Sequence, residues 1–339
     1  MQETEIKAKN NLANTGENKD THSIIILGNG FDVALGYPTK YSQFYENSDL
    51  LRDYAYKGNT LCKHILENVE GELWSDLERG LYQYSLRLTK EYGEGNKGQA
   101  EKFEKEFKEL RKALFNYLDS VAGNSVEFDV QHPAIGLNIE WHELQPQYLT
   151  FNYSINTAVT ADMNQRCILN ANDSINERRF IYQHGSIYNS QEGKNHTPEN
   201  IVLGIDPDSQ SVEPAHSFLY KNKQKLHDLS STKNYIKEKN FYVVYGCSIG
   251  DSDATYFRAI FNHNQNNKIF LIYGYGSEAI ENIKSNIERI CKISIDDLCT
   301  NNYVEFFDVK NVTYTRAKTK KFVQDYLKII NTKKQESFR

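Results

Sequence analysis

The sequence has few cysteines and no long apolar run, and each shortage excludes a class of protein. The cysteines are odd in number and none belongs to a Cys-x-x-Cys pair: Cys62, Cys167, Cys247, Cys291 and Cys299. This pattern argues against a disulfide framework and against a four-cysteine zinc site. No apolar stretch approaches the roughly 20 residues that span a bilayer, and the first 22 residues lack the apolar core of a signal peptide. We therefore expect a cytoplasmic protein with no membrane partner.

The sequence also lacks an excess of positive charge. Its net charge is −5, and its main basic cluster runs from Arg316 to Lys321 with Lys333 and Lys334 nearby. A solvated helix face and a frayed tail explain that cluster, so nucleic acid is not an expected partner. With 339 residues, 39% of them hydrophobic and 25% charged, the chain is long enough for one large or two ordinary globular domains.

The most informative segment is an apolar run that ends in a glycine-flanked polar turn. Ser23 to Leu27 is followed by Gly28, Asn29, Gly30, Phe31 and Asp32. An unbroken run of branched apolar residues is typical of a buried parallel strand, and glycines let the backbone approach a phosphate closely. The full G-x-G-x-x-G fingerprint is absent because position 33 is valine. A nucleotide-binding turn and a plain strand-to-helix connection are therefore both open.

The order of patterns along the chain predicts a doubly wound, mainly parallel, Rossmann-like α/β fold with a helical insertion. Expected strands follow Ser23 to Leu27 at Tyr148–Phe151, Phe180–Gln183, Ile201–Leu203, Phe241–Tyr245, Ile269–Tyr273 and Val304–Phe307. Expected helices between or after them are Ala254–His263, Ser277–Lys292 and Lys318–Asn331. We expect a disordered tail at 1–20, the α/β domain at 21–45 and 146–339, and a mostly helical insertion at 46–145. An insertion after a strand's carboxyl end lies over the ligand crevice, so we interpret it as a cap.

Polar clusters stand just beyond the carboxyl ends of five expected strands. They are Gly28–Asp32, Asn152–Ser154, His184–Ser186, Gly204–Asp206 and Gly246–Asp253. The carboxyl ends of parallel strands share one edge of a sheet, so all five clusters are expected to face one crevice.

The residue types in these clusters suit a nucleotide site. The Asn152 amide suits ribose hydroxyls or a carboxamide, and its alternative is an Asx turn that caps a helix. His184 is the best candidate for a general base among the histidines, and its alternative is a hydrogen-bonded structural turn. Gly246, Ser248 and Gly250 suit a second phosphate-binding turn. Asp251 and Asp253 suit a metal pair or a ribose-binding acid, with helix capping as the alternative for Asp253.

The order of these motifs resembles the AbiH family of bacterial phage abortive-infection proteins. The resemblance rests on Ile26–Asp32, Leu35–Ser42, Trp74–Glu78, Thr150–Tyr153, His184–Ser186 and Tyr245–Asp253, and runs from about residue 23 to 260. It implies a function in antiviral defence. An effector that destroys a cell component must be silent in healthy cells, so we expect a second copy of the chain or a defence-system protein as its macromolecular partner.

A more distant resemblance is to sirtuin-like NAD hydrolases. It implies a sirtuin-like sheet in which Gly28 and Gly30, with the Asn29, Phe31 and Asp32 turn, hold the pyrophosphate, while Gly246 and Ser248 contact phosphate. It further implies that Asn152 binds the nicotinamide ribose and that His184 is the base. The sequence departs from the sirtuin pattern at Ser154, where an acid is expected, and Asp32 or Asp206 is the candidate substitute. The paired zinc-binding cysteines of sirtuin deacylases are also absent.

Three hypotheses follow from the sequence. The leading one is a phage-defence effector that binds NAD as substrate and hydrolyses its nicotinamide–ribose bond, without a resident cofactor or metal. The second is a module that senses NAD or a related nucleotide without turnover. The third is a nuclease effector in which Asp32, Asp206, Asp251 and Asp253 hold Mg²⁺, because strand-end carboxylates are suitable ligands for that ion.

Overall fold

A six-stranded parallel sheet forms the centre of the molecule. The computed structural model describes residues 23–68, 74–122, 133–144, 146–153, 180–187, 197–224, 229–261 and 266–337, so the tail expected at 1–20 lies outside the described residues. The strands are β1 (Ser23–Leu27), β2 (Gln147–Thr150), β3 (Phe180–Tyr182), β4 (Phe241–Tyr245), β5 (Ile269–Gly274) and β6 (Tyr303–Asp308). Their spatial order is β3-β2-β1-β4-β5-β6, and every pair is parallel. The order reverses between β1 and β4, where sheets of this kind bind ligands.

One expected strand is wrong. Ile201 to Leu203 is not part of the sheet, because Ile201 pairs with Gly185 only in an isolated bridge. The segment is nevertheless buried, since Ile201 and Leu203 pack with the helical part of the chain. Burial against helices therefore explains its apolar residues. A short apolar run is compatible both with a sheet strand and with a segment packed against helices, so the sequence pattern does not distinguish them.

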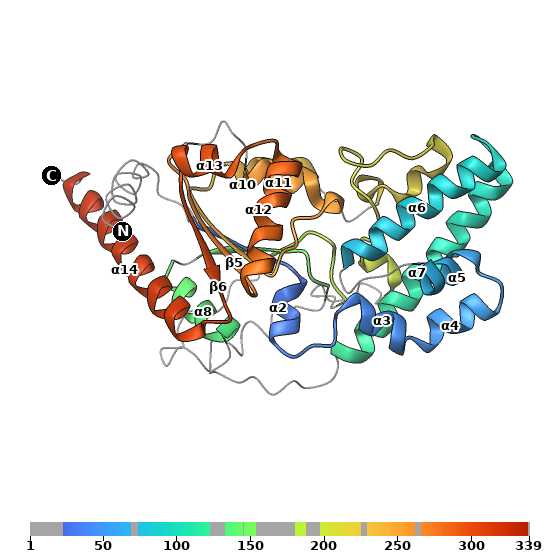
Figure 1. Ribbon diagram of the computed structural model, residues 1–339, viewed down its shortest axis with the longest axis horizontal. Helices are drawn as coiled ribbons and strands as arrows, with labels where there is room; N and C mark the ends of the chain where they lie inside the picture. The colour runs from blue at the N-terminus through green and yellow to red at the C-terminus, as the bar shows by residue number, and fades with distance from the viewer. Residues whose placement is uncertain are drawn as a thin grey trace.

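Helices cover both faces of the sheet (Figure 1). The helices on one face are α10 (Leu229–Lys237), α11 (Ala254–Ile260), α12 (Ser277–Cys291) and α13 (Ile295–Asn301). The helices on the other are α2 (Asn29–Ala34), α8 (Pro133–His142) and α14 (Val312–Ser337). Ile24 and Ile26 of β1 face the first group and Ile25 and Leu27 face the second, as strand alternation requires. This arrangement confirms the doubly wound, Rossmann-like α/β fold.

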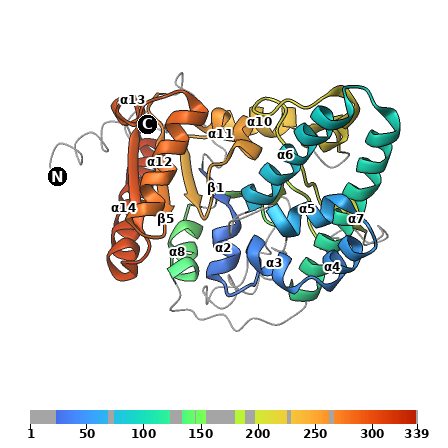
Figure 2. The same ribbon diagram turned by 45° about the vertical axis from the view of Figure 1, so that its right-hand side comes forward.

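A helical cap with its own apolar core stands beside the sheet (Figures 1 and 2). Its helices are α3 (Tyr41–Asn47), α4 (Asp49–Tyr56), α5 (Thr60–Asn68), α6 (Trp74–Tyr92) and α7 (Lys97–Ala122). Three short 3₁₀ helices come from a later part of the chain: η2 (Pro198–Asn200), η3 (Pro214–Leu219) and η4 (Lys221–Lys223). The segment that holds η2 and η3 adds Ile205, Val212 and Leu219 to the cap core. Helix α8 lies within the range 46–145 but packs on the sheet, where Trp141 Nε1 donates to Tyr273 Oη.

The loops after β1 and β4 touch each other backbone to backbone. Gly28 N donates to Tyr245 O and Gly30 N donates to Gly246 O, each over 2.9 Å. Gly246 has a φ angle of +69°, and a Cβ atom added there would lie 2.5 Å from Phe31 N. A Cβ atom at Gly28 would lie 2.5 Å from Gly246 O. Only glycine fits these positions, because any larger residue would push the two loops apart.

We predict that Gly246→Ala destabilises the protein by about 3 kcal/mol, since left-handed strain and a backbone clash add together. Gly58→Ala is the matched control, because Gly58 also has a positive φ of +97° but has no neighbouring atom within 4 Å of the added Cβ. The control should cost about 1 kcal/mol, from strain alone. Urea denaturation midpoints measure both variants, and equal losses would contradict the contact between the loops.

Candidate functional site

A cavity of about 530 Å³ opens over the carboxyl ends of β1, β2, β4 and β5. Its volume suits a small-molecule ligand. Cap residues Glu78 and Leu118 contribute to its wall, opposite residues of the sheet loops. Nine of the site residues predicted from the sequence line it: Gly28, Asn29, Gly30, Asp32, Asn152, His184, Gly246, Ser248 and Asp253. The sequence-based convergence of strand-end clusters is therefore largely confirmed.

Asn152 and Asp32 form a buried amide–carboxyl pair in the cavity wall. Asn152 Nδ2 donates to Asp32 Oδ1 and to Gly28 O, each over 2.9 Å. Burial raises the pKa of Asp32 to about 8, and the hydrogen bond from Asn152 opposes that rise only in part. Asn152 Oδ1 is buried and has no hydrogen-bond partner in the described part of the chain. The pair thus presents an acid that holds its proton at neutral pH and an acceptor to which no described residue donates.

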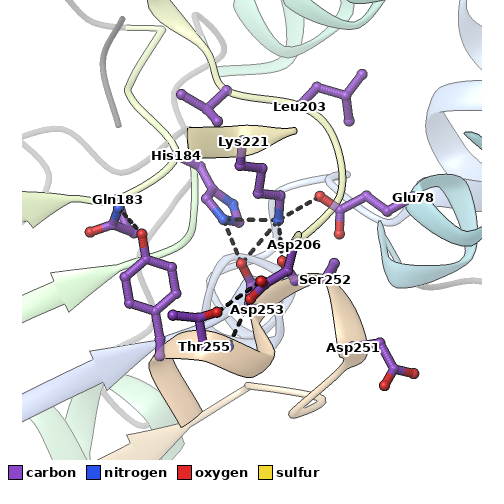
Figure 3. Close-up of polar contacts among 12 residues, drawn as sticks. Glu78, Gln183, His184, Leu203, Asp206, Lys221, Asp251, Ser252, Asp253 and Thr255 are labelled. Atoms are coloured by element: carbon purple, nitrogen blue, oxygen red, sulfur yellow. Dashed lines mark hydrogen bonds and ion pairs between the residues drawn. The ribbon is translucent and has the colours of Figure 1, made fainter. Parts of the chain in front are cut away.

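His184 belongs to a buried ionic network of four side chains (Figure 3). Its Nε2 lies 2.8 Å from Asp253 Oδ1 and 3.2 Å from Lys221 Nζ. Lys221 Nζ also lies 2.9 Å from Asp253 Oδ1 and 2.8 Å from Glu78 Oε1, and donates to Ser252 O over 3.0 Å. Residues from α6, the end of β3, η4 and the loop after β4 thus meet at one ammonium group.

The electrostatics of the network follow from these distances. The nearby Lys221 ammonium and His184 hold the pKa of Asp253 well below its ordinary value, although burial opposes this. Burial acts to lower the pKa of Lys221, but Asp253 and Glu78 outweigh it and the net shift is upward. Asp253 is thus a carboxylate and Lys221 an ammonium. The contact with Asp253 fixes the imidazole of His184 through Nε2 and leaves Nδ1 outside the network.

The sequence analysis missed Lys221 and included Glu78 only as the last residue of the Trp74–Glu78 motif, without a functional role. Lys221 stands in the polar run Tyr220-Lys221-Asn222-Lys223, which reads as a solvated loop, yet its side chain is 2% exposed. Glu78 follows buried Leu77 and precedes buried Leu81 by three residues, so helix spacing places it at the margin of the apolar face of α6. This spacing is a sequence signal for the position of Glu78, but it does not identify Lys221 as the partner.

The glycine turn differs from the expected phosphate cradle. The backbone N–H groups of Gly28 and Gly30 donate to β4 and its loop, and Phe31 N donates to Gly28 O. These three donors are occupied within the protein, so phosphate binding at the cavity must use other groups. Gly185 is likewise packed against backbone, because a Cβ there would lie 2.0 Å from Asn200 O.

Three predicted site residues do not line the cavity. Phe31 is a core residue whose ring meets Tyr245 edge to face. Asp206 does not follow a sheet strand, and it accepts hydrogen bonds from Thr255 N over 2.7 Å and from Thr255 Oγ1 over 2.8 Å. Asp251 pairs with Arg289 on the surface at 2.6 Å.

These contacts decide the capping alternative for Asp253 and show where the two candidate substitutes for the acid at position 154 lie. Asp253 makes no side-chain capping bond to α11 although it stands at the N-cap, and Asp206 takes that hydrogen-bonding position instead. Of the two candidates for the acid missing at position 154, Asp32 contacts Asn152, whereas Asp206 is held by Thr255.

The described residues lack both a cluster of metal ligands and a membrane-spanning helix. They contain no group of three or more His, Cys, Asp or Glu residues arranged to hold a metal ion. The magnesium site that Asp32, Asp206, Asp251 and Asp253 would form in a nuclease is therefore not assembled among them. Within the same residues, no helix combines the length and the apolar character that crossing a bilayer requires.

We predict that Asp32→Asn stabilises the protein at pH 8 by ~5 kcal/mol and that the gain disappears near pH 4. The pKa of Asp32 is about 8 in the folded state and ordinarily 3.8. Between these values the folded protein holds a proton that the unfolded chain has lost, so rising pH costs stability that the variant does not lose. Chemical denaturation at pH 5 and pH 8 measures the difference. A stability gain that does not grow with pH would contradict the raised pKa.

The chain matches a known protein family over most of its length. The family described as Bacteriophage abortive infection AbiH matches residues 24–275 of the chain. A search among curated proteins finds no match. The matched range covers most of the 339 residues and includes the cap, the predicted site residues, Glu78 and Lys221. The chain therefore belongs to the bacteriophage abortive infection family AbiH, which indicates a function in phage defence.

Proposed function

We propose that this protein is a cytoplasmic effector of abortive infection that binds NAD and hydrolyses its nicotinamide–ribose bond. The observation that carries the proposal is the convergence of Asn152, Asp32 and His184 on one cavity at the reversal of strand order. Open α/β sheets bind nucleotides at that point. The motif order that resembles sirtuin-like NAD hydrolases supports the same ligand.

The cavity lining indicates how the ligand is oriented. Asn152, Asp32 and His184 belong to the reacting end, where the ribose needs hydrogen-bond partners and a base. The amides of Gly28 and Gly30 are occupied, so the pyrophosphate must be held by other groups of the lining. Lys40 is the lysine in the described lining, and its positive charge suits a phosphate group.

The reaction that we propose breaks the bond between ribose C1′ and the nicotinamide nitrogen. The bonding electron pair leaves with nicotinamide, and C1′ acquires oxocarbenium character. Asn152 Oδ1 accepts a hydrogen bond from the ribose or from the attacking water, and Asp32 holds the Asn152 amide in place. Water forms the new C1′–O bond and passes its proton to His184, which Asp253 orients. The products are nicotinamide, ADP-ribose and a proton.

A second candidate is nucleotide sensing without turnover. The observation that favours it is the confinement of His184, whose Nε2 is held by Asp253 and Lys221 in a network that is 5% exposed at the histidine. A histidine held in this way is also typical of a structural site. Binding of intact NAD without product formation would select this candidate.

We predict that Asn152→Ala and His184→Ala each lower the rate of nicotinamide release by about 100-fold or more, because they remove the acceptor and the base. Asn47→Ala is the matched control, since Asn47 is an exposed residue of α3 outside the cavity. Purified protein is incubated with NAD, alone and with extract from phage-infected cells, and nicotinamide is quantified. NAD that stays intact in both conditions would overturn the proposed hydrolysis.

A further inference from the structure

Glu78 brings a cap carboxylate to the reacting end of the cavity. It lies on α6, its side chain is 6% exposed, and it is among the residues that line the cavity. Its Oε1 lies 2.8 Å from Lys221 Nζ, and the same nitrogen lies within 3.2 Å of His184 and 2.9 Å of Asp253. One ammonium group thus separates Glu78 from the histidine of the proposed reaction (Figure 3).

The charges of this group do not cancel. Glu78 and Asp253 are paired with the single ammonium of Lys221, so with the neutral His184 imidazole that a base requires, the four side chains carry one net negative charge. A net charge in a low-dielectric site is unfavourable unless a positive partner approaches. The cavity is where such a partner would enter, because Glu78, Asp253 and His184 all line it.

We infer that Glu78 is a catalytic carboxylate, supplied by the cap, for the positive charge of a nicotinamide nucleotide, and that Lys221 is its positioning residue. The inference rests on the proposed function and names the charged form of the substrate. In NAD the nicotinamide ring is a cation, and during cleavage the positive charge moves to ribose C1′. Carboxylates fixed beside that path stabilise both the bound ring and the oxocarbenium ion. When His184 then accepts the proton from water, the charges of the four side chains sum to zero.

This arrangement gives the cap a chemical function besides covering the cavity. The carboxylate of Glu78 comes from α6, while Asp253 and His184 come from the sheet loops. The reacting end is complete only when cap and sheet are in contact. Binding of a cationic ring therefore stabilises the contact between α6 and the sheet loops, and that contact in turn strengthens binding.

The test compares NAD with NADH, which have nearly the same shape but differ by the one positive charge on the nicotinamide ring. The variants are Glu78→Gln, which removes the charge, and Glu78→Asp, which retains it. Glu91→Gln is the control, because Glu91 is an exposed residue of the same helix outside the cavity. Calorimetry measures the dissociation constants of both nucleotides, nicotinamide release measures turnover, and circular dichroism verifies folding.

We expect the wild-type protein and Glu91→Gln to prefer NAD over NADH by about 10-fold or more. Glu78→Gln should lose that preference and, where turnover is observed, slow nicotinamide release by about 100-fold, whereas Glu78→Asp should keep most of the preference. The preference is a ratio within one folded sample, so a general loss of stability does not produce the same result.

The outcomes separate the two proposals. A preference for NAD that depends on Glu78 supports the inference even without turnover, which would then indicate sensing. An unchanged preference and unchanged turnover in folded Glu78→Gln would overturn the role of Glu78 and leave NAD hydrolysis standing. If neither nucleotide binds to the wild-type protein, the proposed function and this inference are both wrong.

Discussion

A buried ammonium group requires carboxylates close to it. Lys221 is such a group, and its partners come from separate parts of the fold. Desolvation makes an isolated buried charge very unfavourable, so Lys221 stays charged only while Glu78 and Asp253 remain within 3 Å of it. Those partners come from the cap helix α6 and from the loop after β4, and His184 touches the same nitrogen from the end of β3. The contact between cap and sheet loops and the orientation of the candidate base therefore depend on one side chain, whose removal would leave two buried carboxylates without their ammonium partner.

The glycines of the first turn serve a different purpose from the one that their spacing indicates. A glycine pair after a buried strand is typical of phosphate binding through free backbone amides. Here Gly28 and Gly30 use their amides to bring the loop after β1 against Gly246. This close approach draws together the two loops that flank the reversal of strand order, and Asn152 bonds to Gly28 O from the neighbouring strand. The glycines thus shape the cavity floor, while side chains provide its chemistry.

Much of the fold and the outline of the site were predictable from the sequence, because both depend on local patterns. The apolar run at Ile24 to Ile26 is buried on both faces, as a central parallel strand must be. Asn152 and His184 line one cavity because parallel strands end at one edge of the sheet. The burial of Lys221 was not predictable, since its partners are separated from it by more than 30 residues and its neighbours resemble a solvated loop. The run at Ile201 to Leu203 was misread as a strand because packing against cap helices selects the same apolar residues as a sheet does.

The cap core is built from two separate parts of the chain. Residues from 197–219 pack among α3 to α7, although more than 70 residues of chain separate them from the end of α7. Excision of 46–122 would therefore uncover Ile205, Val212 and Leu219 and leave an exposed apolar surface on the segment that carries η2 and η3. The cap is therefore not a detachable module, and a single deletion cannot reduce this protein to its sheet domain.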